Sequence, residues 1–384
     1  MDATDATRSR GEGGRWRRRG LIGLVVLLVV ALLAQPVRTR VVAAVTVVDG
    51  LDLPVPRPFA TEVERRATTV GDLEVDVYGP PDEVATSPLL DGPQAAGRIV
   101  VLVPGATPAG RDDRRLVTLA EAFARSDRVV VIPELEVYQE DLVPEDIERI
   151  VGLVGSLADR HGPVVLTGIS FGGSLAMIAA GDPRLEDRIA LLGTFGAYAD
   201  LGGVVQAATT GESLVDGERY PWDPDPRAAQ VVRDQIVGLL PPEDGRRLEA
   251  ALDGEVAPAA LRPDLRAAYD LLTNEDPERT MALVEALPQV VRDRLEVVSP
   301  TRAVPQLEVP LVALHAHDDP VIPYGELWRL GVTYPHAELM SLTTFDHVGI
   351  DPDREVSWWV TVQDLWTTSR FADRMLDAQA RGWW

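Results

Sequence analysis

The chain has 384 residues, of which 46% are hydrophobic and 25% are charged, with 37 basic and 60 acidic residues and a net charge of −23. Its length and hydrophobic content exceed what one packed core requires, which excludes general disorder. The sequence contains no Cys, and every basic residue is Arg. Disulfides, thiol nucleophiles, cysteine-based metal sites and chemistry that needs a lysine amine are therefore excluded.

An uncharged apolar run near the N-terminus, residues 20–34, predicts a membrane segment. Six Arg precede the run, and Arg38 and Arg40 follow it. Counted to residue 37, the run has 18 residues, a length between that of a signal-peptide core and that of a full membrane span. A cleaved signal peptide and a retained anchor are both open. The missing A-x-A cleavage motif favours a retained transmembrane anchor over residues 20–37.

The Arg excess before the run predicts the topology of the chain. An Arg-rich tail, residues 1–19, is expected in the cytoplasm, and the chain after the anchor is expected outside it. This makes the protein a single-pass protein of the cell membrane with an extracytoplasmic domain. Beyond residue 40, 29 Arg stand against 57 acidic residues, a net charge of −28. Nucleic acid is excluded as a partner of this part, because phosphate binding needs a basic surface.

Closely spaced prolines at positions 54, 56 and 58 predict a linker over residues 38–68. Beyond it, strand and helix patterns alternate along the chain. Strands are predicted over residues 73–77, 98–103, 128–132, 163–167 and 189–192. Helices are predicted around residues 116–123, from Pro144, and over residues 174–180. Successive βα units of this kind predict an α/β fold with a mainly parallel central sheet flanked by helices.

The alternation stops at residues 193–308, where short helical patterns are separated by prolines. We interpret this block as a mostly helical cap, inserted into an α/β core that is formed by residues 69–192 and 309–384. Strand patterns resume over residues 309–314 and 337–342, before a terminal helix that begins near Asp353.

Residues 168–172 read Gly-Ile-Ser-Phe-Gly and match G-x-S-x-G, the nucleophile elbow, in which a sharp strand-to-helix turn lifts the serine oxygen above a sheet. The pentad alone is a weak signal. Its context strengthens it, because a predicted strand ends directly before it and a helix of small residues follows. Ser170 is therefore the candidate nucleophile.

With this motif in this context, the sequence resembles the α/β-hydrolase superfamily, in particular its serine esterase and lipase-like members, over about residues 70–192 and 305–370. The family carries its acid in a run like L-H-G-x-x-D-x-x-x-P, which residues 314–323 match with Ala316 in place of glycine. The resemblance implies Asp319 as the acid, with Asp318 as the alternative, and His347 as the histidine after the last strand. The chain order of serine, aspartate and histidine is the order of this fold.

In a triad of this kind, the histidine removes the serine proton and the acid orients the imidazole. The family takes its oxyanion donors from the backbone N–H after the nucleophile and from a loop after an early strand. These positions are Phe171 and Ala106, with Thr107 as an alternative to Ala106. The resemblance implies a carboxylic-ester hydrolase acting on a small-molecule or lipid-like ester, without a cofactor or metal. The sequence does not indicate an oligomeric state.

Two other functions stay open. A noncatalytic binding or scaffold protein is compatible with this fold. A zinc-dependent hydrolase is the second alternative, because His315, His317 and Asp319 follow part of the H-x-H-x-D-H motif of metallo-β-lactamase-like hydrolases. Pro320 replaces the last histidine of that motif, which disfavours a zinc site.

Five of the eight Trp lie in the final helical region, at positions 358, 359, 366, 383 and 384. One interpretation is an aromatic anchor at the membrane interface. The favoured interpretation is a helical stripe of Trp358, Val362, Leu365 and Trp366 that packs on the sheet.

Overall fold

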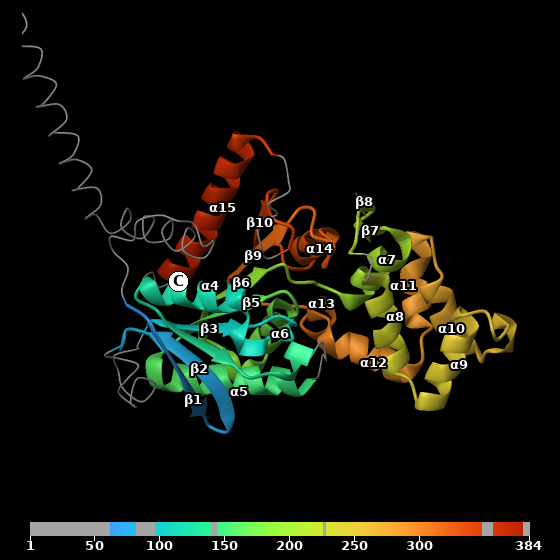
Figure 1. The fold of residues 1–384 in the computed structure, drawn as a ribbon, viewed down its shortest axis with the longest axis horizontal. Helices are drawn as coiled ribbons and strands as arrows, with labels where there is room; N and C mark the ends of the chain where they lie inside the picture. Colours follow the sequence, from blue (N-terminus) through green and yellow to red (C-terminus); the bar gives the residue numbers. More distant parts are fainter. Residues whose placement is uncertain (1–61, 82–96, 140–143, 226–227, 348–355, 379–384) are drawn as a thin grey trace, which may run out of the picture.

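The computed structural model describes residues 62–81, 97–139, 144–225, 228–347 and 356–378 (Figure 1). The predicted tail, the predicted transmembrane anchor and most of the predicted linker lie outside the described residues. Within the described ranges, no helix combines the length and the apolar character that a membrane span requires.

An eight-stranded sheet forms the centre of the described chain, in the order β1-β2-β4-β3-β5-β6-β9-β10. The pairs β1–β2 and β2–β4 are antiparallel, and the other neighbours are parallel. The mainly parallel sheet predicted from the alternating patterns is thus confirmed. The strands are β1 (Glu64–Val70), β2 (Leu73–Gly79), β3 (Ile99–Val103), β4 (Val129–Pro133), β5 (Val164–Ile169), β6 (Ile189–Phe195), β9 (Leu311–Ala316) and β10 (Glu338–Leu342).

Helices cover both faces of the sheet, because its central strands are apolar on both sides. Every residue of β3 and β4 is buried, as expected for parallel strands between two helical layers. The helices α5 (Pro144–His161), α6 (Phe171–Ala180) and α14 (Gly325–Thr333) pack on one face, and α4 (Arg114–Arg125) and α15 (Trp358–Asp377) pack on the other. Two hydrophobic clusters, one on each face, hold the layers together.

The first strand corrects the predicted end of the linker. Residues 64–70 form β1, whereas the linker was expected to continue to residue 68. The sequence did not predict this strand, because β1 lies at the edge of the sheet and pairs only with β2. It buries only its last residue, Val70. An edge strand with polar side chains on both faces has no alternating hydrophobic pattern.

Between β6 and β9, the chain forms a separate helical unit with a hydrophobic cluster of its own. It contains α7 (Leu201–Thr210), α8 (Ala228–Gly238), α9 (Pro242–Leu252), α10 (Pro263–Leu272), α11 (Pro277–Glu285), α12 (Gln289–Val298) and the short α13 (Pro300–Ala303). The expected start at residue 193 was too early, since β6 continues to Phe195 within the sheet.

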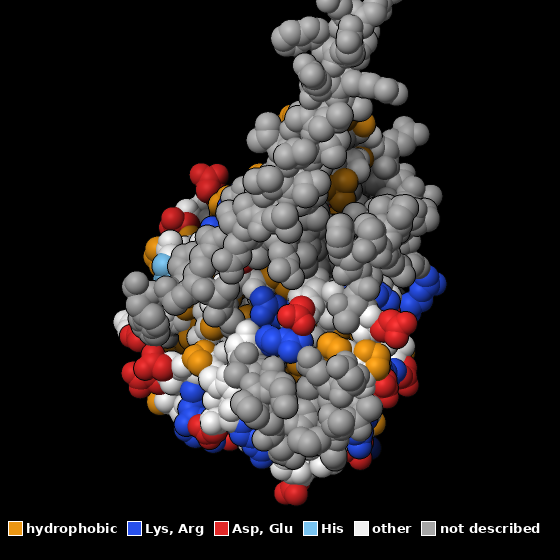
Figure 2. All heavy atoms as spheres, turned by 90° about the vertical axis from the view of Figure 1, so that its left-hand side faces the viewer, with side chains coloured by type: hydrophobic (Ala, Val, Ile, Leu, Met, Phe, Trp, Pro, Cys, Tyr) orange, Lys and Arg blue, Asp and Glu red, His pale blue; other side chains and the backbone are white. Residues whose placement is uncertain are grey.

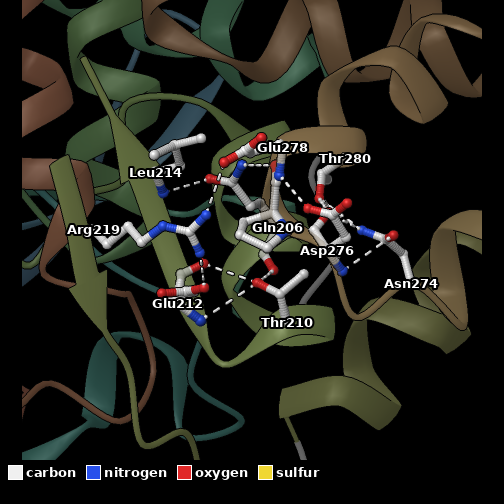
Figure 3. A network of polar contacts seen from close by, with 10 residues as sticks. Gln206, Thr210, Glu212, Leu214, Arg219, Asn274, Asp276, Glu278 and Thr280 are labelled. Atoms are coloured by element: carbon white, nitrogen blue, oxygen red, sulfur yellow. Dashed lines mark hydrogen bonds and ion pairs between the residues drawn. The ribbon is translucent and has the colours of Figure 1, made fainter. Parts of the chain in front are cut away.

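A two-stranded hairpin of β7 (Glu212–Val215) and β8 (Glu218–Pro221) adds a sheet that the helical patterns had not predicted. A polar network ties the hairpin to the helices (Figure 3). The Gln206 side chain accepts a hydrogen bond from Leu214 N and donates one to the Pro277 carbonyl. Arg219 on β8 pairs with Glu212 and with Glu278 on α11. The network makes the hairpin part of the helical unit.

The terminal helix also differs from its favoured interpretation. It begins at Trp358, and the side chains of Trp358, Val362 and Trp366 are 74%, 44% and 62% exposed. The predicted packing of this stripe on the sheet is therefore wrong, although Leu365 does contact the core. The helix is held instead by its C-terminal half, where Phe371, Ala372, Met375 and Leu376 are buried.

Candidate active site

The turn between β5 and α6 holds Ser170 in a strained conformation, with φ 52° and ψ −130°. Positive φ is uncommon for a residue with a side chain, and it persists here because the chain is held on both sides. A Cβ atom added to Gly168 would lie 2.5 Å from the Gly172 carbonyl oxygen, and one added to Gly172 would lie 2.0 Å from the Pro104 carbonyl oxygen. Two glycines therefore permit the turn that exposes the serine oxygen to the cavity.

His347 connects the serine to a carboxylate. Its Nδ1 lies 2.5 Å from Asp319 Oδ2, and its Nε2 lies 3.0 Å from Ser170 Oγ. A carboxylate can only accept, so Nδ1 carries the proton and donates it. Nε2 is then an acceptor and receives the hydrogen bond that Ser170 Oγ donates. This is the tautomer in which the imidazole can remove the serine proton.

Asp319 is fully buried after β9 and is held through both of its carboxylate oxygens. Oδ1 accepts hydrogen bonds from Val321 N at 2.8 Å and Ile322 N at 2.9 Å, which leaves Oδ2 facing the histidine. The Trp222 indole donates to the Asp319 carbonyl at 2.7 Å. The acid is thus fixed by its own turn and by a residue of the helical unit.

The ionisable residues next to Asp319 in the sequence, Asp318, His317 and His315, make other hydrogen bonds. Asp318 is exposed, and its carboxylate lies 2.6 Å from Nδ1 of the exposed His317. His315 is buried, with Nε2 3.0 Å from the Ile322 carbonyl and 3.5 Å from Asp319 Oδ2. Burial lowers the pKa of His315, so this imidazole is neutral and donates to the carbonyl. Among the described residues, no group of three His, Asp or Glu side chains is arranged to hold a metal ion.

Hydrogen bonds to α15 hold the loop that carries His347. The buried Asp364 carboxylate accepts hydrogen bonds from Thr343 N, from Thr344 N at 2.6 Å and from Thr344 Oγ1 at 2.7 Å. Three hydrogen bonds to one oxygen fix the backbone just before the histidine. Sequence reasoning missed Asp364, although a lone carboxylate in the Trp-rich stretch 358–366 was a usable signal.

The two predicted oxyanion donors belong to segments that meet at the nucleophile. Phe171 follows Ser170 at the first position of α6, where backbone N–H groups have no partner within the helix. Ala106 belongs to the loop after β3, and this loop lies against the elbow, since a Cβ on Gly105 would lie 2.9 Å from Ser170 Cβ. Both residues line the same cavity as Ser170 and His347. The alternative, Thr107, also lines it and donates its hydroxyl to Asp113.

The cavity above Ser170 has a volume of about 520 Å³ and lies between the core and the helical unit. Its floor contains Ser170 and His347, and α8 supplies Val231, Val232 and Ile236 to its wall. The lining is mainly aliphatic, and its polar residues come both from the core, such as Ser170 and His347, and from the helical unit, such as Gln235 and Arg294. Apolar cavities with a few polar groups are typical of binding sites for small organic molecules.

A model of the alpha/beta hydrolase family matches residues 100–356, two thirds of the chain. A search of curated proteins by sequence finds no match. Among solved structures, Est1E from Butyrivibrio proteoclasticus is 14% identical, covering 83% of this chain and 99% of that one, with a TM-score of 0.42. EstE1, a thermostable carboxylesterase cloned from a metagenomic library, is 15% identical over 89% of this chain and 94% of that one, with a TM-score of 0.44.

Proposed function

The chain belongs to the alpha/beta hydrolase family, and from this premise we propose that it is a serine hydrolase that cleaves carboxylic esters. One observation carries the proposal: an unbroken line of hydrogen bonds runs from Asp319 through His347 to Ser170 at the floor of an apolar cavity. Each residue stands where the chemistry needs it, with the acid buried, the base between the two, and the nucleophile facing the cavity.

In the proposed reaction, His347 Nε2 takes the proton of Ser170 Oγ as that oxygen bonds to the ester carbonyl carbon. The negative charge that develops on the carbonyl oxygen is stabilised by the backbone N–H groups of Phe171 and Ala106. His347 then returns the proton to the leaving alcohol, and an acyl-enzyme remains. Water, deprotonated by the same Nε2, attacks the acyl carbon. His347 then returns this proton to Ser170 Oγ as the bond to the acyl carbon breaks and the acid is released.

The substrate class follows from the cavity. Its volume of about 520 Å³ and its aliphatic wall suit an ester with a sizeable apolar acyl or alcohol group, either a small molecule or a lipid. Burying such a group stabilises the complex by about 0.8 kcal/mol per methylene. We therefore expect kcat/KM to rise with chain length until the cavity is filled.

The same proposal includes the location of the enzyme. Residues 20–37 anchor it in the cell membrane, and the Arg-rich tail keeps the N-terminus in the cytoplasm. The catalytic domain is then extracytoplasmic. A reporter active only outside the cytoplasm, fused after Trp384, tests this topology. Activity of the reporter supports the proposal, and activity of a cytoplasmic reporter at the same position reverses it.

Reaction of the full-length protein with a fluorophosphonate probe tests the nucleophile, because the probe labels serines activated by a neighbouring base. We expect labelling of the wild type and none of Ser170→Ala. Ser341→Ala, which removes an exposed hydroxyl on β10, is the matched control and should label fully. An unlabelled wild type would favour a noncatalytic binding protein. Activity that is lost with a chelator and restored by zinc would favour the metal-dependent alternative.

A further inference from the structure

The N-terminal half of α15 exposes an unusually apolar face. Trp358, Trp359, Val362 and Trp366 are 74%, 55%, 44% and 62% exposed. With 100° per residue, these four side chains lie within about one third of the helix circumference. They therefore form one continuous surface, the Trp face, rather than scattered exposed residues.

Within residues 357–369, the Trp face has no exposed charge, and Arg370, which borders it at its C-terminal end, pairs with Glu338. Of residues 357–369, only Asp364 is ionisable, and it is buried beneath the helix, where it binds the loop of His347. Elsewhere the domain is strongly acidic, with a net charge of −28 beyond residue 40. Acidic and Arg side chains are interspersed over the described surface in Figure 2. A lipid headgroup region disfavours acidic side chains, so a face without them is the one that can approach it.

The position of the helix leaves this face accessible. In Figure 1, the C-terminal half of α15 lies close to α4, and its N-terminal end points away from the body of the molecule. The buried residues near its C-terminus, such as Phe371 and Met375, hold the helix on the sheet. The Trp face is thus carried on a rigidly attached element and stands clear of the core.

The start of the described chain lies on the same face of the sheet as α15. Val63, the second described residue, packs against the same hydrophobic cluster as Leu365 of α15. Residues 38–61 connect this point to the proposed anchor, a distance of at most about 80 Å for a fully extended chain. With the proposed anchor, this length keeps the domain within about 80 Å of the bilayer, and its entry point packs on the same cluster as α15, the helix that carries the Trp face.

We propose that the Trp face of α15 lies in the interface of the phospholipid bilayer to which the protein is anchored. The inference rests on the membrane anchoring proposed above, and it assigns the domain one orientation at the membrane. Indole rings favour this interface because they combine an apolar ring with a hydrogen-bond donor. Three indoles and a valine without any exposed charge fit that environment better than the surface of a second protein, where charged groups surround the apolar centre.

The absence of Cys allows a specific label to test the proposal. Val362→Cys, at the centre of the Trp face, is labelled with an environment-sensitive fluorophore in the full-length protein reconstituted in phosphatidylcholine vesicles. Ala259→Cys is the matched control: the residue is exposed and lies between α9 and α10, which Figure 1 shows at the end of the molecule far from α15. We expect a blue-shifted emission from position 362 that is at least halved by lipids carrying a nitroxide near the headgroup, and no quenching at position 259.

Three results would overturn the proposal. Water-like emission at position 362 would mean that the Trp face is solvated. A blue shift without lipid quenching would mean that protein, either a second copy or another segment of this chain, covers the face. Quenching that persists after Trp358→Glu and Trp366→Glu would mean that the indoles do not mediate the contact.

Failure of the anchor is a separate outcome. If the protein does not remain with the vesicles after a carbonate wash, the anchoring proposal is wrong. The same labelled protein is then added to preformed vesicles, and a lack of nitroxide quenching at position 362 overturns the Trp face as well.

Discussion

At the scale of single residues, the candidate site depends on how Asp319 is held. Its carboxylate is buried, and two backbone N–H groups occupy Oδ1. Only Oδ2 is directed at His347, so the carboxylate selects the imidazole tautomer that can accept from Ser170. The arrangement makes the residue sensitive to a change of a single atom.

Asp319→Asn should lower kcat by about 10⁴-fold while the protein remains folded. The amide nitrogen would donate to Nδ1, which moves the imidazole proton to Nε2 and removes the base from the serine. Hydrolysis of a p-nitrophenyl ester measures the loss. Asp318→Asn, whose exposed side chain contacts His317 instead, is the control and should keep wild-type activity. Equal losses in the two variants would contradict the assignment of Asp319 as the acid.

Another buried carboxylate, Glu326, takes no part in the proposed reaction and lies close to the start of the helical unit. Its Oε2 accepts from Ala199 N at 2.9 Å and Asp200 N at 2.8 Å, and its Oε1 accepts from Arg329. Burial raises the pKa of Glu326 above its ordinary value. Glu326 therefore makes folding stability depend on pH.

Because the folded protein has the higher pKa for Glu326, its stability decreases as the pH rises. As the pH rises above about 4.3, the ordinary pKa of a glutamate, the unfolded chain releases this proton before the folded protein does. The stability contributed by neutral Glu326 is complete below this pH and is lost as the pH rises through the folded pKa. Glu326→Gln avoids this loss, so its Tm relative to the wild type should increase with pH. Parallel Tm profiles of Glu326→Gln and of the exposed control Glu243→Gln would refute the prediction.

At the scale of elements, the strand-turn-helix unit of β5 and α6 depends on close backbone contact. The turn brings Gly172 against the Pro104 carbonyl of the loop that also holds Ala106. Since both partners are backbone atoms, a side chain cannot be accommodated by a rotamer change. The spacing of the glycines in the pentad is therefore a packing requirement of the elbow.

Gly172→Ala should destabilise the protein by about 1–3 kcal/mol and reduce kcat, because its Cβ forces apart the elbow and the loop of Ala106. Gly152→Ala in α5 is the control: outside the backbone of its own helix and its chain neighbours, no atom lies within 4 Å of the added Cβ. An alanine there should stabilise the helix by about 0.5–1 kcal/mol. Denaturant unfolding and ester hydrolysis measure both effects. A fully active Gly172→Ala protein would show that the close contact is not required.

At the scale of the whole molecule, the cavity exists because the helical unit lies over the core. The core supplies the reactive groups, and α8 supplies much of the aliphatic wall. Trp222 links the two parts, since it belongs to the inserted block and donates to the carbonyl of Asp319. In the proposed function, the core supplies the reactive groups and the helical unit contacts the apolar part of the substrate.

Val232→Trp should reduce kcat/KM for long-chain esters and leave acetate esters nearly unaffected, because the indole fills cavity volume at the wall that α8 supplies, while the reactive groups belong to the core. A series of p-nitrophenyl esters of increasing chain length measures the change. Val290→Trp on α12, which adds an indole at an exposed position outside the cavity, should leave the series unchanged. A uniform loss at all chain lengths would show that Val232 acts on folding or catalysis and not on chain length.

Patterns with a local physical cause were predictable from the sequence. Buried parallel strands such as β3 and β4 are continuous apolar runs, and the elbow is a contiguous pentad with its strand and helix beside it. The strands β1 and β8 were missed because exposed strands have no hydrophobic signature. The strand β7 was missed because its buried face combines Ser213 with Val215, which gives no apolar alternation. The Trp stripe was misassigned because periodicity reports that residues share a face, but not whether another element covers that face.

By itself, the sequence determined the α/β class, the mainly parallel sheet, and the presence of a serine elbow, because these depend on local backbone preference and short-range hydrophobic order. It also determined which chemistry is absent, through the missing Cys and Lys. The tertiary structure alone decided that Asp319 and not Asp318 contacts His347, that Asp364 holds the loop of His347, and that the Trp face remains exposed. These depend on contacts between segments far apart in the chain, and only the packed fold specifies such distances.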